Sequence, residues 1–209
     1  MRPILTAVIA LAVATPLVGQ STPQVPGAQD ATRITGGTYA TDPSHSLIGF
    51  EVNHFGFNDY YGIFGDVAGT LVLDPKNPAA AKVDVTIPVA SVTTPSQGMT
   101  DHLLRAGKEG SPPDFFGANP APARFVSTAV KVNGMEAEIT GNLTLNGVTK
   151  PVTLEAEFIG AGTNPYNKKE TVGFEAETTI KRSDFGVSYG IPLVGDEVEL
   201  DISVAFEKQ

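Results

Sequence analysis

Residues 141–158 read G-N-L-T-L-N-G-V-T-K-P-V-T-L-E-A-E-F, and this stretch decides the fold. Leu143 and Leu145 alternate with polar residues before Asn146-Gly147, and the alternation resumes after that pair. Alternation with a period of two gives a strand one apolar and one polar face. An Asn-Gly pair between two such strands is typical of a type I′ turn, because both central residues need a positive φ. The stretch therefore predicts an antiparallel hairpin.

This turn also fixes the register of the hairpin. The pairs that face each other on the apolar side are then Leu145 with Val148, Gly141 with Val152, and Ile139 with Leu154. Pro151 has no backbone N–H to donate, so we expect its nitrogen to point outward or to lie at a bulge.

The same alternation recurs along the chain and predicts eight strands. They lie at residues 45–55, 62–74, 82–92, 124–132, 135–145, 148–160, 171–182 and 197–207. Because turn-rich joins separate them, we expect an antiparallel sheet that closes into a barrel or splits into a sandwich. An eight-stranded barrel has room for side chains or one small ligand. Several inward positions carry small residues: Gly69, Ala137, Gly141, Ala156, Ala176 and Thr178. They either leave space for a ligand or fit a barrel interior that becomes narrower toward one end. Pro88 implies an edge or a bulge.

Residues 96–117 interrupt the β pattern. Residues 100–106 can form about two helical turns, with Gly107 as their end. The following Pro-Pro-Asp at 112–114 excludes regular structure, and Phe115 and Phe116 come directly after it. Loop aromatics in such a place usually plug the end of a core.

The N-terminal residues are typical of a targeting segment. Arg2 supplies a positive charge, and residues 4–13 form an apolar run too short to span a bilayer. We therefore predict a signal peptide at 1–19, cleaved between 14 and 20, the alternative being a buried N-terminal helix. Residues 20–38 read as a flexible leader and 39–209 as the folded domain. The protein is then exported, to the periplasm or outside the cell.

Composition narrows the choice of partners. The chain has 209 residues, of which 41% are hydrophobic and 18% charged, a globular balance. Its net charge of -9, without clustered Lys or Arg, excludes nucleic-acid binding because phosphate backbones would repel it. It has no cysteine, so disulfides contribute nothing.

The histidines are the first candidates for catalysis or metal binding. His45 and Ser46 are adjacent, so on a strand they face opposite sides and cannot act as base and nucleophile. His54 shares the parity of the apolar residues before it, which favours a core histidine at a barrel mouth. His102 lies in the predicted helix and should be solvated. Three scattered histidines without cysteine do not predict a zinc site.

One further pair, Arg182 and Asp184, could tie a loop by an ion pair. The sequence contains neither a glycine-rich phosphate loop nor a G-x-S-x-G motif. We therefore predict no catalytic residue and no metal, and classify the protein as a non-enzyme.

Five motifs in order resemble the YceI-like polyisoprenoid-binding family over nearly the whole predicted domain. They are D-P-S-H-S-L-I-G-F-E-V-N-H at 42–54, G-x-F at 62–64, D-F-F at 114–116, G-N-L-T-L-N-G-V-T-K-P-V-T-L at 141–154 and R-S-D-F-G at 182–186. The resemblance implies an all-β fold: an eight-stranded antiparallel lipocalin-like β-barrel, with the short helix and loop excursion near 100–117. It also implies an apolar lumen that holds an isoprenoid or other long-chain lipid, quinone-like or polyprenyl.

The resemblance further implies which residues contact the ligand. The expected lining is Phe50, Val52, Val67, Leu71, Val85, Ile87, Leu143, Leu154, Phe174 and Ile180, with His54 near a rim and with Phe57, Phe115, Phe116 and Ala176 as further contacts. The stretch at 55–61 is more aromatic than the small-residue loop of the family, and Gly117 stands where Asp is common.

The sequence thus favours an exported lipid-binding protein that carries or sequesters its ligand and requires no cofactor. Transient membrane contact and a homodimer are both compatible with this reading. Two alternatives stay open: an outer-membrane β-barrel, and an exported enzyme acting on a lipid-like substrate. The absence of obvious aromatic girdles disfavours the first, and the lack of a catalytic group with partners disfavours the second.

Overall fold

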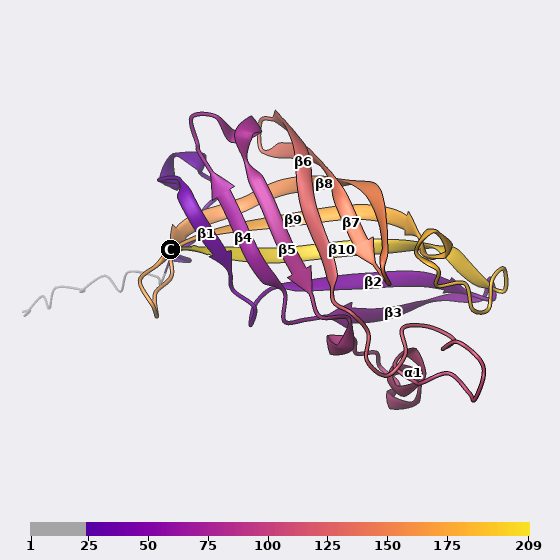
Figure 1. The fold of residues 1–209 in the computed structure, drawn as a ribbon. Coiled ribbons are helices and arrows are strands. Elements are labelled where there is room, and N and C mark those ends of the chain that lie inside the picture. The colour runs from indigo at the N-terminus through magenta and orange to yellow at the C-terminus, as the bar shows by residue number, and fades with distance from the viewer. Residues whose placement is uncertain (1–23) are drawn as a thin grey trace, which may run out of the picture.

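The computed structural model describes residues 24–209, in which all strands belong to one antiparallel sheet (Figure 1). The strands are β1 Gly37–Thr41, β2 Leu47–His54, β3 Asn58–Phe64, β4 Ala68–Leu73, β5 Lys82–Ile87, β6 Ala123–Asn133, β7 Glu136–Leu145, β8 Val148–Thr163, β9 Glu170–Lys181 and β10 Val194–Lys208. The helix α1 spans Gln97–Leu103, and short 3-10 turns lie at Ala31–Arg33, Pro78–Ala80, Val89–Ser91 and Arg182–Phe185. The predicted signal peptide at 1–19 lies outside the described residues.

The sheet closes into the eight-stranded barrel that the sequence predicted. The strand order is β1-β4-β5-β6-β7-β8-β9-β10, and β1 pairs with β10 to close the ring. Strand β2 continues along β10 beyond β1, and β3 pairs with β2. The pairs β1/β2 and β3/β4 therefore each act as one interrupted strand of the barrel.

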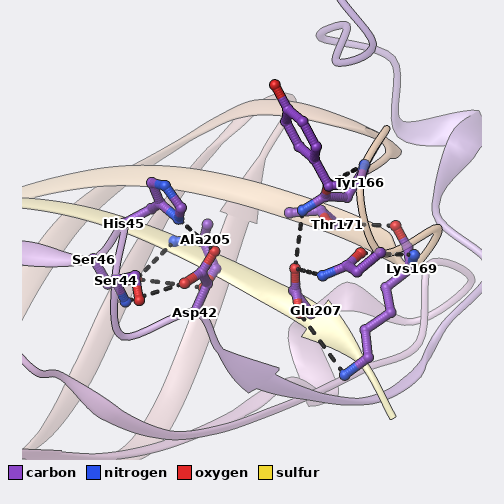
Figure 2. Close-up of polar contacts among 11 residues, drawn as sticks. Asp42, Ser44, His45, Ser46, Tyr166, Lys169, Thr171, Ala205 and Glu207 are labelled. Carbon is purple, nitrogen blue, oxygen red and sulfur yellow. Dashed lines mark hydrogen bonds and ion pairs between the residues drawn. The ribbon is translucent and has the colours of Figure 1, made fainter.

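A compact turn at residues 42–46 divides β1 from β2, as Figure 2 shows. The Asp42 carboxylate accepts a hydrogen bond from the Ser44 N–H at 3.1 Å and contacts the His45 ring at 2.7 Å. The buried Ser46 hydroxyl is 3.4 Å from the Ala205 carbonyl, to which it donates, and accepts from the Ala205 N–H at 3.2 Å. His45 is 77% exposed, and both residues lie in this turn and not on the strand that the sequence predicted at 45–55.

The central hairpin forms with the predicted register. Asn146 and Gly147 have φ of 51° and 77°, and Leu145 pairs with Val148. The other two predicted pairs, Gly141 with Val152 and Ile139 with Leu154, are also present. Pro151 lies opposite Asn142 without a register shift, where β8 is not yet paired with β9, so its nitrogen needs no partner.

Residues 24–36 are not a free leader, contrary to the prediction for 20–38. Ala28 and Ala161 form an isolated antiparallel bridge, with N···O distances of 3.1 and 2.9 Å. Thr35 donates its N–H and hydroxyl to Glu170 at 2.9 and 2.6 Å. The segment leads directly into β1, which begins at Gly37. Local composition missed these contacts because their partners lie more than a hundred residues away.

Several predicted boundaries were also wrong. The strand predicted at 82–92 ends at Ile87, because Pro88 precedes a 3-10 turn. The strand predicted at 62–74 is interrupted at 65–67, where Asp66 adopts a φ of 55°. The helix predicted at 100–106 begins earlier, at Gln97, because Ser96 caps it by accepting from the Met99 N–H. It ends at Leu103, before Gly107.

Candidate functional site

The inward faces of the strands enclose two adjoining apolar chambers. The inner chamber has a volume of about 260 Å³ and the outer chamber about 520 Å³. Four aliphatic residues line both and form a waist between them: Ile48, Ile87, Leu143 and Leu200. Of residues 24–209, no Asp, Glu or Lys lines the outer chamber, and its ionisable groups are His54, His102, Tyr60, Tyr189 and Arg182. The site is thus suited to an apolar ligand with a small polar end.

Fourteen of the fifteen residues predicted as ligand contacts line these chambers. The inner chamber has Val67, Leu71, Val85, Leu154, Phe174 and Ala176, the outer has Phe50, Val52, His54, Phe115, Phe116 and Ile180, and Ile87 and Leu143 line both. Phe57 is the one predicted contact that lines neither chamber. It lies at the tip of the β2–β3 hairpin, between the two strands, and is 87% exposed.

Sequence reasoning missed several lining residues. Val198 and Leu200 share the inward parity of β10, so that alternation could have placed them at the site. Met99 and Tyr189 come from α1 and from the loop before β10, and no local pattern points them at the lumen. These residues reach the outer chamber only through the tertiary fold.

His102 lies in a polar and aromatic cluster at the outer chamber, whereas the sequence predicted a solvated side chain. Its Nε2 is 2.7 Å from Asp114 Oδ2, and Arg105 donates to the same oxygen at 2.9 Å. The hydrogen bonds from His102 and then Arg105 hold the pKa of Asp114 below its usual range. The His102 ring also lies 5.1 Å from Phe115 and 5.5 Å from Tyr189. The loop aromatics therefore border the outer chamber, with a histidine among them.

Arg182 ties the loop before β10 to the barrel. Its buried guanidinium donates to the carbonyls of Gly195 at 2.7 Å, Val187 at 3.0 Å, Tyr189 at 2.9 Å and Val194 at 3.0 Å. Burial lowers the pKa of Arg182, against the opposing effect of Asp196. The predicted loop-tying role is therefore correct, but the partners are backbone carbonyls and not the Asp184 carboxylate.

The small inward glycines do not provide space for a ligand. A Cβ on Gly141 would come within 2.4 Å of the Phe125 ring, and one on Gly69 within 2.3 Å of the Asp84 carbonyl. Both glycines therefore accommodate close neighbours. Ala137, Ala156, Ala176 and Thr178 do line the inner chamber, so the space is left by small side chains with a Cβ.

The outer face of the barrel is polar and strongly acidic across β7, β8 and β9. Cross-strand neighbours include Glu138 with Glu155, Glu155 with Glu177, and Glu157 with Glu175. No group of three or more His, Asp or Glu side chains in the described part of the chain is placed to hold a metal ion. Within residues 24–209, no helix is both long and apolar enough to cross a membrane.

Comparison with known proteins agrees with this geometry. A family model described as a YceI-like domain matches residues 39–206. Protein YceI of Shigella flexneri is 47% identical over 161 residues, which cover 77% of this chain and 80% of the relative. The solved structure of a Campylobacter jejuni YceI protein is 30% identical with a TM-score of 0.61, covering 75% of this chain and 90% of that one.

A polyisoprenoid binding domain from Saccharophagus degradans has the same fold, with a TM-score of 0.56 at 15% identity, covering 82% of this chain and 98% of that one. The family model spans most of the chain, and the range that it covers includes residues 42–54, 141–154 and 182–186. This chain therefore belongs to the YceI-like family.

Proposed function

We propose that this protein is exported to the periplasm or the cell exterior and there holds an isoprenoid or other long-chain lipid for carriage or sequestration. The observation that carries the proposal is the pair of adjoining apolar chambers inside a barrel whose outer face is polar. The fold shared with a protein described as a polyisoprenoid binding domain supports the same ligand class. The proposed role is binding, without a catalytic step or a required cofactor.

The polar groups of the outer chamber assign a direction to the bound lipid. His54, Tyr60 and His102 line this chamber, whereas the inner chamber is almost wholly aliphatic and aromatic. Placing the head group in the outer chamber and the tail beyond the waist satisfies both environments. A quinone-like or hydroxylated head group fits donors and acceptors of this kind.

Energetics indicate where affinity is decided. Transfer of a CH₂ group from water into the lumen gains about 0.8 kcal/mol. A lipid taken from a bilayer starts in an apolar medium, so transfer of its tail is nearly neutral. Polar contacts and shape at the outer chamber must then offset the cost of association, which is about 4–15 kcal/mol. Uptake also requires transient contact with a membrane.

Two other functions are less well supported. An outer-membrane barrel would place its apolar side chains outside and its polar side chains in the lumen, which is the reverse of the distribution here. An enzyme acting on a lipid would need a base or nucleophile beside the apolar site. Among the described residues, His102 lines the outer chamber and contacts Asp114 at 2.7 Å, but no Ser or Thr hydroxyl is hydrogen-bonded to its ring.

The test is to purify the protein from a periplasmic extract without detergent, extract it with organic solvent and record a mass spectrum. A stoichiometric isoprenoid or other long-chain lipid is expected. An empty lumen, together with no uptake of a polyprenol supplied in ethanol, would refute the proposed function.

A further inference from the structure

Four exposed apolar side chains lie at the tip of the β2–β3 hairpin and in the loop before β10, beside the outer chamber. Phe57 is 87% exposed, Leu193 67%, Tyr189 49% and Phe55 46%. Phe55 and Tyr189 also line the chamber, so the exposed surface is continuous with the lumen. We call these four residues the apolar rim. It lies at the β2–β3 tip and the loop before β10, opposite the end of the barrel that carries the C-terminus (Figure 1).

The rim is held in place by specific hydrogen bonds. The Phe55 N–H donates to the Leu193 carbonyl at 2.9 Å, which joins the hairpin tip to the loop. Within the tip, the Gly56 N–H donates to Asn53 Oδ1 at 2.8 Å. On the other side, Arg182 fixes the loop through the Tyr189 carbonyl. The exposed side chains therefore project from a fixed scaffold.

Phe55 gives a second, independent indication of function. It has a φ of 58°, in the left-handed region that a bulky residue rarely adopts. Such conformations are kept where the surroundings enforce them, and they cluster at functional sites. Here the strained backbone brings the Phe55 ring to 4.1 Å from the His54 ring, at the edge of the lumen.

We propose that the apolar rim docks on the surface of a lipid bilayer, so that the ligand passes between membrane and lumen without crossing water. The inference rests on the proposed function, since it supplies the route by which a lipid reaches the outer chamber. Aromatic and aliphatic side chains on a protruding tip are suited to insertion at the headgroup boundary.

A second copy of the chain fits the rim less well. From their exposed fractions the four side chains offer on the order of 500 Å², whereas a stable dimer buries about 800 Å² on each partner. The net charge of -9 also makes two copies repel each other. The same charge disfavours anionic lipids, so docking should be strongest on zwitterionic bilayers and little affected by salt.

The experiment compares Phe57→Ser and Leu193→Ser with wild type in flotation with phosphatidylcholine vesicles. Tyr166→Ser is the matched control, because Tyr166 is 93% exposed in the loop between β8 and β9, near the opposite end of the barrel (Figure 2). Uptake of a fluorescent polyprenol delivered in ethanol is measured separately, so that loading and docking are read independently. A parallel series uses vesicles containing phosphatidylglycerol.

We expect each rim variant to lose about tenfold in vesicle partition, with Tyr166→Ser unchanged and loading from ethanol intact in all three. Equal partition of wild type and both rim variants would overturn the proposal. The proposal would also be overturned if the wild type is a dimer in analytical ultracentrifugation and the sole effect of a rim variant is to dissociate it. The rim would then be a contact between two copies of the chain. Failure of the wild type to load polyprenol from ethanol would instead refute the proposed function.

Discussion

At the scale of single residues, Tyr39 shows how the packed end of the barrel is held. It is fully buried, donates to Glu170 Oε1 at 2.6 Å and accepts from the Gly36 N–H at 3.1 Å. Tyr39→Phe leaves both partners without the hydroxyl, so we predict a loss of about 1–3 kcal/mol in the free energy of unfolding. Urea denaturation followed by circular dichroism measures this loss, and an unchanged midpoint would contradict the role assigned to the hydroxyl.

The same residue predicts a pH dependence. Burial, and then the hydrogen bond to Glu170, raises the pKa of Tyr39 to about 12. Because the folded pKa lies above the ordinary value near 10, the protonated form is favoured on folding. The contribution of protonated Tyr39 to the free energy of unfolding is complete below pH 10 and is lost as the pH rises through about 12. Thermal unfolding of the wild type should therefore show a falling melting temperature between pH 10 and about 12. An equal fall in Tyr39→Phe would mean that other groups cause this pH dependence.

At the scale of elements, Arg182 makes the loop before β10 part of the barrel. Its four carbonyl partners would be left unsatisfied in Arg182→Met, and lysine cannot replace a planar group with five donors. We predict that Arg182→Met and Arg182→Lys each lose about 3 kcal/mol or more of stability. The exposed neighbour Asp184→Asn is the control. Equal urea midpoints for all three variants would contradict this prediction.

The elements also show what a sequence can reveal. The β7–β8 hairpin was predictable because its turn residues and its alternation are local, and Asn146 and Gly147 need no distant partner to turn. The interruption between β1 and β2 depends on Ser46 bonding Ala205, and the fold of residues 24–36 depends on Ala28 meeting Ala161. Neither contact has a local signature.

In the candidate site, too, residues on strands were predictable and residues brought in by distant contacts were not. The strand residues that the family resemblance implied as ligand contacts line the two chambers, whereas His102 and Tyr189 reach the outer chamber from α1 and from a loop. Phe57 is not among the residues that line the chambers, because it stands at the exposed tip of the β2–β3 hairpin.

At the scale of the whole molecule, the two ends of the barrel differ. One end is filled by a packed cluster around Tyr39, Phe158, Val172 and Phe206. The other end carries the outer chamber, its polar groups and the apolar rim. A lipid carrier requires this difference between its two ends: a tail site lined by apolar side chains and a head-group site that faces the route of exchange.

The central claim is that the lipid occupies the lumen, and the lipid content of Ala176→Phe tests it most directly. Ala176 lines the inner chamber, and a phenylalanine there fills the space at an overpacking cost of about 1–3 kcal/mol. Thr179→Phe adds the same side chain to an exposed position on the same strand. Ala176→Leu is a milder filling variant.

Each variant is purified without detergent, checked by circular dichroism and extracted for mass spectrometry. We predict that folded Ala176→Phe has lost its long-chain lipid, that Ala176→Leu has lost part of it, and that Thr179→Phe has a full load. A folded Ala176→Phe protein with a full load of lipid would contradict the account, because the ligand would then lie outside the barrel.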